Sequence, residues 1–137
     1  MPNKKSAGEW LTKAYHSLSA AQILLDAEHF TDIIGMELQQ STEKILKSLL
    51  AYENKSIPKT HELISIADQV SKHLTFDDEE TNLLLTATEY YSKERYPVQN
   101  RTLPPVDEIQ QVLSFTWSLF DRVCHILGFD KNEFMKR

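Results

Sequence analysis

The sequence has very little glycine and cysteine, with three glycines and one cysteine among its 137 residues. Tight turns between strands depend on glycine and Asn-Gly pairs, so the scarcity of glycine favours helices over sheet. The single cysteine, Cys124, excludes an internal disulfide framework and a cysteine metal site. No apolar run approaches the ~20 residues that a membrane-spanning helix requires, and the polar N-terminus lacks the pattern of a signal peptide. Together these absences predict a helical protein located in the cytoplasm.

The motifs that would mark a common metal or cofactor site are missing as well. His16, His29 and His73 do not have the spacing of metal ligands, and no H-E-x-x-H motif, P-loop or dinucleotide fingerprint occurs. We therefore expect no metal and no cofactor. The formal net charge of −5 argues against a general nucleic-acid-binding protein, which usually carries a basic footprint. A local basic site is compatible with this charge, because net charge does not say where cations cluster.

Apolar residues recur at helical spacing along most of the chain. Their positions predict helices over about residues 7–26, 30–52, 60–74, 77–96 and 104–127. Each stretch presents one apolar stripe that needs a partner, so the stretches are expected to pack on one another.

Several residues mark the expected ends of these helices. Thr60 is suited to the N-cap of the third helix. Thr75 and Asp77, ahead of two acidic residues, indicate the start of the fourth. Pro97 stops the fourth helix, and Gly128 stands where the C-terminal cap of the last helix belongs.

These elements predict an all-α fold, an up-and-down bundle of four to five helices. No repeat, low-complexity segment or linker divides the chain, so a single domain is expected over residues 1–137. Its core covers about residues 7–127, and residues 129–137 are expected to form a short tail.

The second predicted helix is apolar on more than one side. Ile33, Met36, Leu46 and Leu50 lie well off its main apolar stripe. Such a helix needs cover on more than one side, which a central position in the bundle or a self-association surface would provide. The last helix is similarly broad. A symmetric homodimer is the default outcome of self-association.

Polar residues follow the second predicted helix roughly opposite its main stripe: Gln39, Gln40, Glu43, Lys44 and Lys47. One interpretation is a solvated face with a Glu43–Lys47 ion pair worth about 0.3–0.5 kcal/mol. The other is a partly covered groove, because apolar residues share this side. Lysine and glutamine side chains would then hold a ligand there.

His61 falls in the first turn expected for the third helix. The positive end of that helix disfavours an imidazolium, so His61 is expected to be neutral near pH 7. The free backbone N–H groups of the first turn would also form an anion site. The alternative is a histidine that only packs or caps locally.

Arg95 stands at the end of the fourth predicted helix, directly before Tyr96. It is either a cation placed favourably at the negative helix end or a guanidinium that grips a phosphate. Tyr96 would pack against the protein or stack on a base. Arg101, in the connecting loop, could add a second positive charge.

In the last predicted helix, Asp121 and His125 are i, i+4 neighbours, and Arg122 flanks the apolar face. A surface ion pair is one interpretation of this group. The other is a catalytic pair in which His125 transfers a proton and Arg122 steadies a phosphate.

Four short motifs occur in order along the chain. They are Trp10-Leu11 with Ala14, the stretch from Gln39 to Lys47, Thr60-His61-Glu62-Leu63, and Arg95-Tyr96-Pro97. With these motifs at this spacing, the chain resembles the HEPN family of small helical proteins (higher eukaryotes and prokaryotes nucleotide-binding). The resemblance covers about residues 7–127.

The resemblance implies an up-and-down helical bundle that is commonly a homodimer. Some members of the family are metal-independent ribonucleases, often toxins, with an arginine and a histidine four to six residues apart. Others are accessory proteins encoded beside a small nucleotidyltransferase and help to bind nucleotide or substrate. No arginine here is followed by a histidine at the ribonuclease distance, and the Arg122–His125 spacing is too short.

The resemblance therefore favours a nucleotide- or nucleic-acid-binding accessory protein, partnered with a minimal nucleotidyltransferase in a toxin–antitoxin-like pair. A metal-independent ribonuclease toxin and a non-catalytic structural helical dimer are the alternatives. Arg122 and His125 are the weak candidates for catalysis. The residues carried over as a ligand- and phosphate-binding set are Gln40, Glu43, Lys44, Lys47, His61, Arg95 and Tyr96.

Overall fold

The computed structural model describes residues 1–95 and 102–136, except for the side chains of residues 92–95. These residues form five α-helices, a short 3-10 helix and no strand. The elements are α1 (Lys4–Asp26), α2 (Thr31–Tyr52), α3 (Leu63–Gln69), α4 (Asp78–Arg95), α5 (Val106–Leu127) and η1 (Lys131–Met135). The predicted all-α bundle is confirmed.

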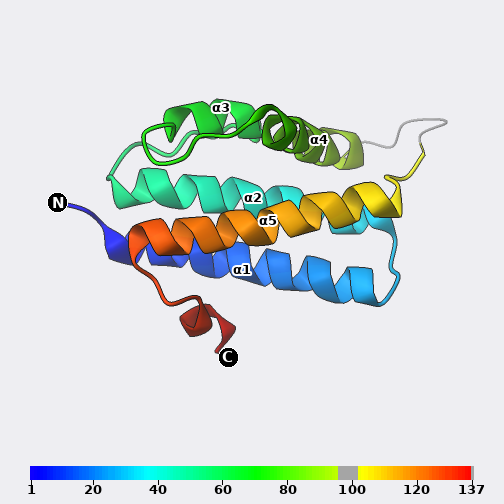
Figure 1. Ribbon diagram of the computed structural model, residues 1–137, viewed down its shortest axis with the longest axis horizontal. Helices are drawn as coiled ribbons and strands as arrows, with labels where there is room; N and C mark the ends of the chain where they lie inside the picture. The colour runs from blue at the N-terminus through cyan, green and yellow to red at the C-terminus, as the bar shows by residue number, and fades with distance from the viewer. Residues whose placement is uncertain (96–101, 137) are drawn as a thin grey trace.

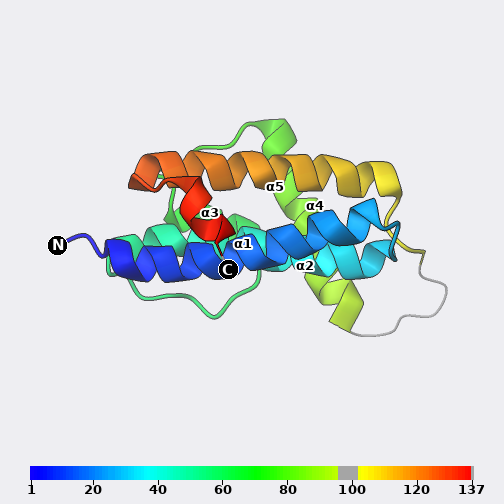
Figure 2. The ribbon, with the colours of Figure 1, turned by 90° about the horizontal axis from the view of Figure 1, so that it is seen from below.

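The helices are arranged around α2. Figure 1 shows α1, α2 and α5 side by side along the long axis of the molecule, with α3 and α4 on the other side of α2 from α1. Figure 2 shows that α4 is inclined steeply to these three helices. Helix α2 contacts each of the four other α-helices. This central position explains why Leu46 and Leu50 are buried although they lie off the main stripe, whereas Ile33 remains 47% exposed.

Local hydrogen bonds explain where the helices begin and end. The Asn3 side chain accepts from the Ser6 N–H at 3.0 Å and caps α1. At the start of α4, the Glu80 N–H donates to the Asp77 carboxylate at 2.8 Å, and the Asp77 N–H donates back to Glu80 at 3.2 Å. This reciprocal capping box confirms the predicted start of the fourth helix. Gly128 ends α5 in the left-handed region, with φ of 76°.

The third helix is shorter than the sequence predicts. It begins at Leu63 rather than Thr60 and ends at Gln69 rather than Leu74. The Thr60 hydroxyl accepts from the Glu62 N–H at 3.1 Å, so Thr60 caps a turn ahead of the helix and not the helix itself. Leu74 is nevertheless buried, because the chain after α3 folds back over the core.

The segment expected to be a short tail forms part of the packed structure. Its 3-10 helix carries Phe134, which is 8% exposed and lies 5.6 Å from the Phe120 ring, centroid to centroid. The Lys4 ammonium donates to the Gly128 carbonyl at 2.8 Å, which joins the two ends of the chain. In the ranges that the structure covers, no helix has the length and apolar character needed to span a lipid bilayer.

Candidate functional site

The polar residues of α2 lie beneath the connection between α2 and α3. Gln39 is fully buried, and Glu43 and Lys47 are each 5% exposed. The interpretation of this side as a solvated face is therefore wrong for these three residues. Burial of charged groups is costly unless each one is paired and hydrogen-bonded, so their partners decide whether the arrangement is stable.

The Glu43 carboxylate is the centre of this group. It accepts from the Lys47 ammonium at 2.8 Å and from the Gln39 amide at 3.0 Å. Its Oε1 atom also lies 2.8 Å from Nδ1 of His61, which belongs to the α2–α3 connection. The same Gln39 amide donates to the His61 carbonyl at 3.1 Å. We call Gln39, Glu43, Lys47 and His61 the Glu43 cluster.

The charge of Glu43 is set by two opposing effects. Burial raises the pKa of this carboxyl, while the hydrogen bonds from Lys47, Gln39 and His61 and the charge of Lys47 lower it. The lowering effects dominate, so the pKa of Glu43 is below its usual value. A carboxylate at this position compensates the buried Lys47 ammonium at neutral pH.

His61 lies just ahead of α3 and not in its first turn, so the expected placement is corrected. The expected anion site at this helix start does not form from these groups either. The Leu63 N–H donates to the Thr88 hydroxyl at 3.1 Å, and the Glu62 N–H is bonded to Thr60. The seven-residue length of α3 also leaves it with little dipole.

The His61 ring is held between a carboxylate and an aromatic ring. It stacks on Tyr91 of α4 with a centroid distance of 4.0 Å and an interplanar angle of 25°. The His61 side chain is 41% exposed, whereas its partner Glu43 is 7% exposed. One nitrogen of the ring therefore faces the buried carboxylate, while part of the ring is accessible to a ligand.

Gln40 and Lys44 connect the Glu43 cluster to the surface beside α1. The Gln40 side-chain amide donates to the side-chain oxygen Oε1 of Gln39 at 2.8 Å. The Lys44 ammonium donates to Oε1 of Gln40 at 3.4 Å. Lys44 also lines a hollow of about 350 Å³ together with Glu9, Trp10 and Lys13 of α1. We call this the Trp10 hollow.

The structure describes only part of the region predicted around Arg95. Helix α4 ends at Arg95, one turn beyond Tyr91, which stacks on His61. The Arg95 side chain, Tyr96 and Arg101 lie outside the described residues. Their assignment to the ligand-binding set stays a prediction.

Arg122 and His125 do not form a pair. The Arg122 guanidinium makes an ion pair with Glu80 of α4 and lies 5.9 Å from the centroid of the Phe76 ring. His125 is exposed in the last turn of α5. The carboxylate of Asp121, expected near His125, instead lies 3.5 Å from the Lys131 ammonium. Arg122 therefore fixes α5 to α4, and this geometry offers no shared site for catalysis.

Metal and thiol chemistry have no visible basis in the part of the chain that the structure describes. That part contains no group of three histidine, cysteine or acidic side chains arranged to hold a metal ion. Cys124 is buried, and burial raises the pKa of its thiol to about 12. Such a thiol is a poor nucleophile near neutral pH.

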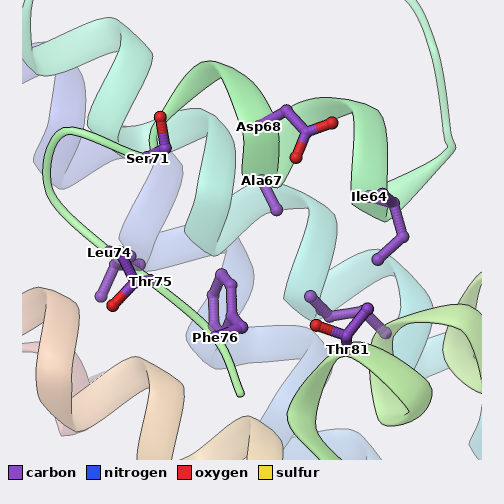
Figure 3. A pocket seen from close by; sticks show the side chains of 9 residues that line it. Ile64, Ala67, Asp68, Ser71, Leu74, Thr75, Phe76 and Thr81 are labelled. Carbon is purple, nitrogen blue, oxygen red and sulfur yellow. The ribbon is translucent and has the colours of Figure 1, made fainter. Parts of the chain in front are cut away.

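A second hollow lies between α3, the loop after it and the start of α4 (Figure 3), with a volume of about 260 Å³. Leu74, Phe76 and Leu84 supply apolar surface, and Thr81 supplies a hydroxyl. Asp68 is the only charged side chain among its described lining residues. The described lining of this hollow therefore offers no cation for a phosphate, in contrast to the Trp10 hollow.

The candidate site contains residues that the sequence did not single out for this role. Trp10, Lys13 and Tyr91 were missed, and Gln39 was noted but not carried into the predicted set. Trp10 and Lys13 are three positions apart on α1, which places them on one face, but only the packing of α2 reveals Lys44 beside them. Tyr91 gave no signal beyond its position next to an apolar stripe.

The fold and these residues agree with a known family. The HEPN domain pattern matches residues 7–126 of this chain, so the chain belongs to the HEPN family. HEPN domains commonly dimerise. No curated protein sequence gives a significant match.

Solved structures resemble this fold closely. The crystal structure of TT1696 from Thermus thermophilus has a TM-score of 0.72 and 20% sequence identity, covering 88% of this chain and 97% of that one. The crystal structure of ST0689, an archaeal HEPN homologue, has a TM-score of 0.66 and 16% identity with the same two coverages. At these identities, the similarity concerns the fold alone.

Proposed function

We propose that this protein is a cytoplasmic nucleotide- or nucleic-acid-binding accessory protein that works with a minimal nucleotidyltransferase in a toxin–antitoxin-like pair. The observation that carries the proposal is the chain of hydrogen bonds running from the buried Glu43 carboxylate to two accessible groups. One end is the His61 ring, and the other is the Lys44 ammonium in the Trp10 hollow. Membership of the HEPN family supports a nucleotide- or RNA-related role.

The proposed roles follow from exposure. Lys44, which reaches the surface, and Arg95, at the end of α4, meet phosphate groups. His61 contributes a ring nitrogen, and Tyr96 lines the site. Lys47 does not reach the ligand directly, because its ammonium lies on Glu43. Lys47 and Glu43 instead hold His61 in place, and Gln40 does the same for Lys44.

We propose a homodimer as the working form. One support is that HEPN domains commonly dimerise. The other is that apolar residues near the α1–α2 turn are exposed, with Phe30 66% and Ile33 47% exposed. Sedimentation equilibrium tests this part independently. A monomer at micromolar concentration would contradict it.

Ligand binding is tested by calorimetric titration with nucleoside monophosphates and short single-stranded RNA. An Arg95→Ala, Lys44→Ala double variant is expected to bind at least about tenfold more weakly, because two phosphate contacts are removed. Lys131→Ala is the matched control, since Lys131 lies on the C-terminal segment and its side chain is 59% exposed. Equal binding by all three proteins, or no binding by the wild type, would contradict the proposal.

The nucleotidyltransferase partner needs its own test. Co-expression with a minimal nucleotidyltransferase encoded beside this chain is expected to give a complex that survives size-exclusion chromatography. Separate elution of the two proteins at micromolar concentration would contradict the pairing.

A ribonuclease is the second candidate, and one observation favours it. A partly exposed His61 whose Nδ1 atom faces the Glu43 carboxylate has the orientation of a histidine that transfers protons in catalysis. Incubation with RNA in the presence of EDTA tests this directly. Cleavage that disappears in His61→Ala would establish the enzyme, and intact RNA would exclude it.

A further inference from the structure

The two tryptophans of the chain lie in different surroundings. The Trp117 ring packs edge-on against Tyr15 at 6.0 Å, and its indole N–H donates to Gln22 at 3.1 Å. Trp10 is half-buried at the edge of the Trp10 hollow. Among the described residues, it has no stacked ring and its indole N–H has no hydrogen-bond partner. Part of a large aromatic surface is thus open to a ligand.

Two cations border the same hollow. Lys13 is exposed and makes no ion pair with any residue in the described ranges. Among the described residues, the Lys44 ammonium makes one long hydrogen bond, of 3.4 Å to Gln40, and its charge also acts on the Glu37 carboxyl. Neither lysine is committed to a buried partner, in contrast to Lys47, so both are available to an anion. Ammonium groups are suited to phosphate as point charges.

Glu9 adds a carboxylate to the same hollow. Its carboxylate repels phosphate but accepts hydrogen bonds from N–H groups. A nucleobase with an exocyclic amino group carries such donors, and a phosphate does not. The combination of an indole face, two ammonium groups and one carboxylate therefore matches the chemistry of a nucleotide, which carries both N–H donors and a phosphate.

The volume agrees with this occupant. At about 350 Å³, the Trp10 hollow is in the lower part of the range of ~300–1,000 Å³ that small-molecule sites occupy. The hollow in Figure 3 is smaller and has only the Asp68 charge among its described lining residues, which would repel a phosphate. A third hollow carries Lys4 and Lys5, but the Lys4 ammonium is already bonded to the Gly128 carbonyl.

We propose that the Trp10 hollow is a nucleotide subsite in which Trp10 stacks on an amino-bearing base, Glu9 accepts from the base edge, and Lys13 and Lys44 hold the phosphate. This inference rests on the proposed nucleotide-binding function and adds the location and the base class of the ligand. It extends the site onto α1, because Lys44 belongs both to this hollow and to the hydrogen-bond chain that ends at His61.

Tryptophan fluorescence tests the stacking, since the chain offers a matched pair of single-tryptophan variants. In Trp117→Phe, only Trp10 emits, and adenosine 5′-monophosphate is expected to quench it in a saturable manner. In Trp10→Phe, only Trp117 emits, and the same titration is expected to leave the emission unchanged. Circular dichroism of both variants checks that the helices are retained.

Calorimetry with the same nucleotide gives the size of the effect. Trp10→Ala is expected to raise Kd roughly 5- to 150-fold, the range for loss of one stacked base. Lys13→Ala is expected to raise Kd at least about fivefold, while Lys131→Ala leaves it unchanged. Uridine 5′-monophosphate, which lacks an exocyclic amino group, is expected to bind more weakly than the adenosine or cytidine nucleotide to wild type but not to Glu9→Gln.

The outcomes separate this inference from the function on which it rests. Binding that is lost in Arg95→Ala but unchanged in Trp10→Ala, with no quenching in Trp117→Phe, overturns the Trp10 subsite and leaves the proposed function standing. Absence of nucleotide and RNA binding by the wild type overturns both. Saturable quenching of Trp10 together with weaker binding in Lys13→Ala establishes the subsite.

Discussion

Oε1 of Glu43 lies 2.8 Å from Nδ1 of His61, and this contact joins the middle of the central helix to the connection that covers it. On its other oxygen, Glu43 accepts from Lys47 at 2.8 Å. One buried carboxylate therefore holds a buried cation and an accessible ring together.

Glu43→Gln leaves the Lys47 ammonium, which is 5% exposed, without a charged partner. Removal of one member of a buried ion pair typically costs about 3–5 kcal/mol, so we expect a fall of this size in the free energy of unfolding. Urea denaturation followed by circular dichroism measures it. Glu62→Gln, an exposed position on the same connection, is expected to change stability by less than about 0.5 kcal/mol.

Replacing both charges separates the pair from the site as a whole. Glu43→Leu with Lys47→Met is expected to recover most of the stability that Glu43→Gln loses, because two well-packed apolar groups can replace a buried pair. A double variant as unstable as Glu43→Gln would show that the ion pair itself is not the source of the loss.

The lowered pKa of Glu53 makes the stability of the fold depend on pH. Hydrogen bonds from Lys55, at 2.8 Å, and from His73 lower the pKa of Glu53 from 4.5 to about 2. A group whose pKa is lower in the folded state stabilises the fold above its unfolded pKa. That contribution is lost as the pH falls through the folded value. We therefore expect Glu53→Gln to reduce the free energy of unfolding at pH 7 and to have little effect near pH 2.

Urea titrations of both proteins at pH 7, 4 and 2.5 measure this difference. The difference in free energy of unfolding between wild type and Glu53→Gln is expected to become smaller as the pH falls from about 4.5 toward 2. A difference in free energy of unfolding that stays constant over this pH interval would show that the ion pairs of Glu53 do not stabilise the fold. A carboxyl resonance of Glu53 that titrates near pH 4.5 would show that its pKa is not lowered in the folded state.

Gly35 of α2 packs closely against Tyr90 of α4, so a larger residue at position 35 is expected to clash. A Cβ atom at this position would lie 2.8 Å from Cγ of Tyr90, whose hydroxyl donates to Glu108 at 2.6 Å. Overpacking costs about 1–3 kcal/mol, while alanine gains about 1 kcal/mol of helix propensity over glycine. Thermal denaturation of Gly35→Ala is therefore expected to show a net loss of up to about 2 kcal/mol. Combined with Tyr90→Leu, the two losses should be less than additive, and full additivity would indicate no clash.

The helices were predictable because their signals are local. Apolar periodicity gives α1, α2 and α5, and the Asp77–Glu80 box gives the start of α4. The limits of α3 were not predictable in the same way. Its apolar residues continue at helical spacing to Leu74, yet the helix ends at Gln69, because tertiary contacts bury Leu74 without a helix.

The site was predictable in composition but not in arrangement. The sequence marks Glu43, Lys47 and His61 as unusual, but it does not say that Lys47 is buried or that His61 returns to Glu43 from 18 positions away. Loop geometry sets that contact. The role of Trp10 was not predictable for the same reason. Only the packing of α2 on α1 shows that Lys44 lies in the same hollow.

We propose that one surface, from Trp10 through Lys44 to His61, receives a nucleotide. Heteronuclear NMR of the isotope-labelled protein, titrated with adenosine 5′-monophosphate, tests it most directly. We expect saturable shifts of the Trp10 indole N–H and of the Lys44 and His61 backbone amides, with the Trp117 indole unmoved. Shifts confined to the residues around Asp68 and Thr81, or no shifts at millimolar nucleotide, would contradict it.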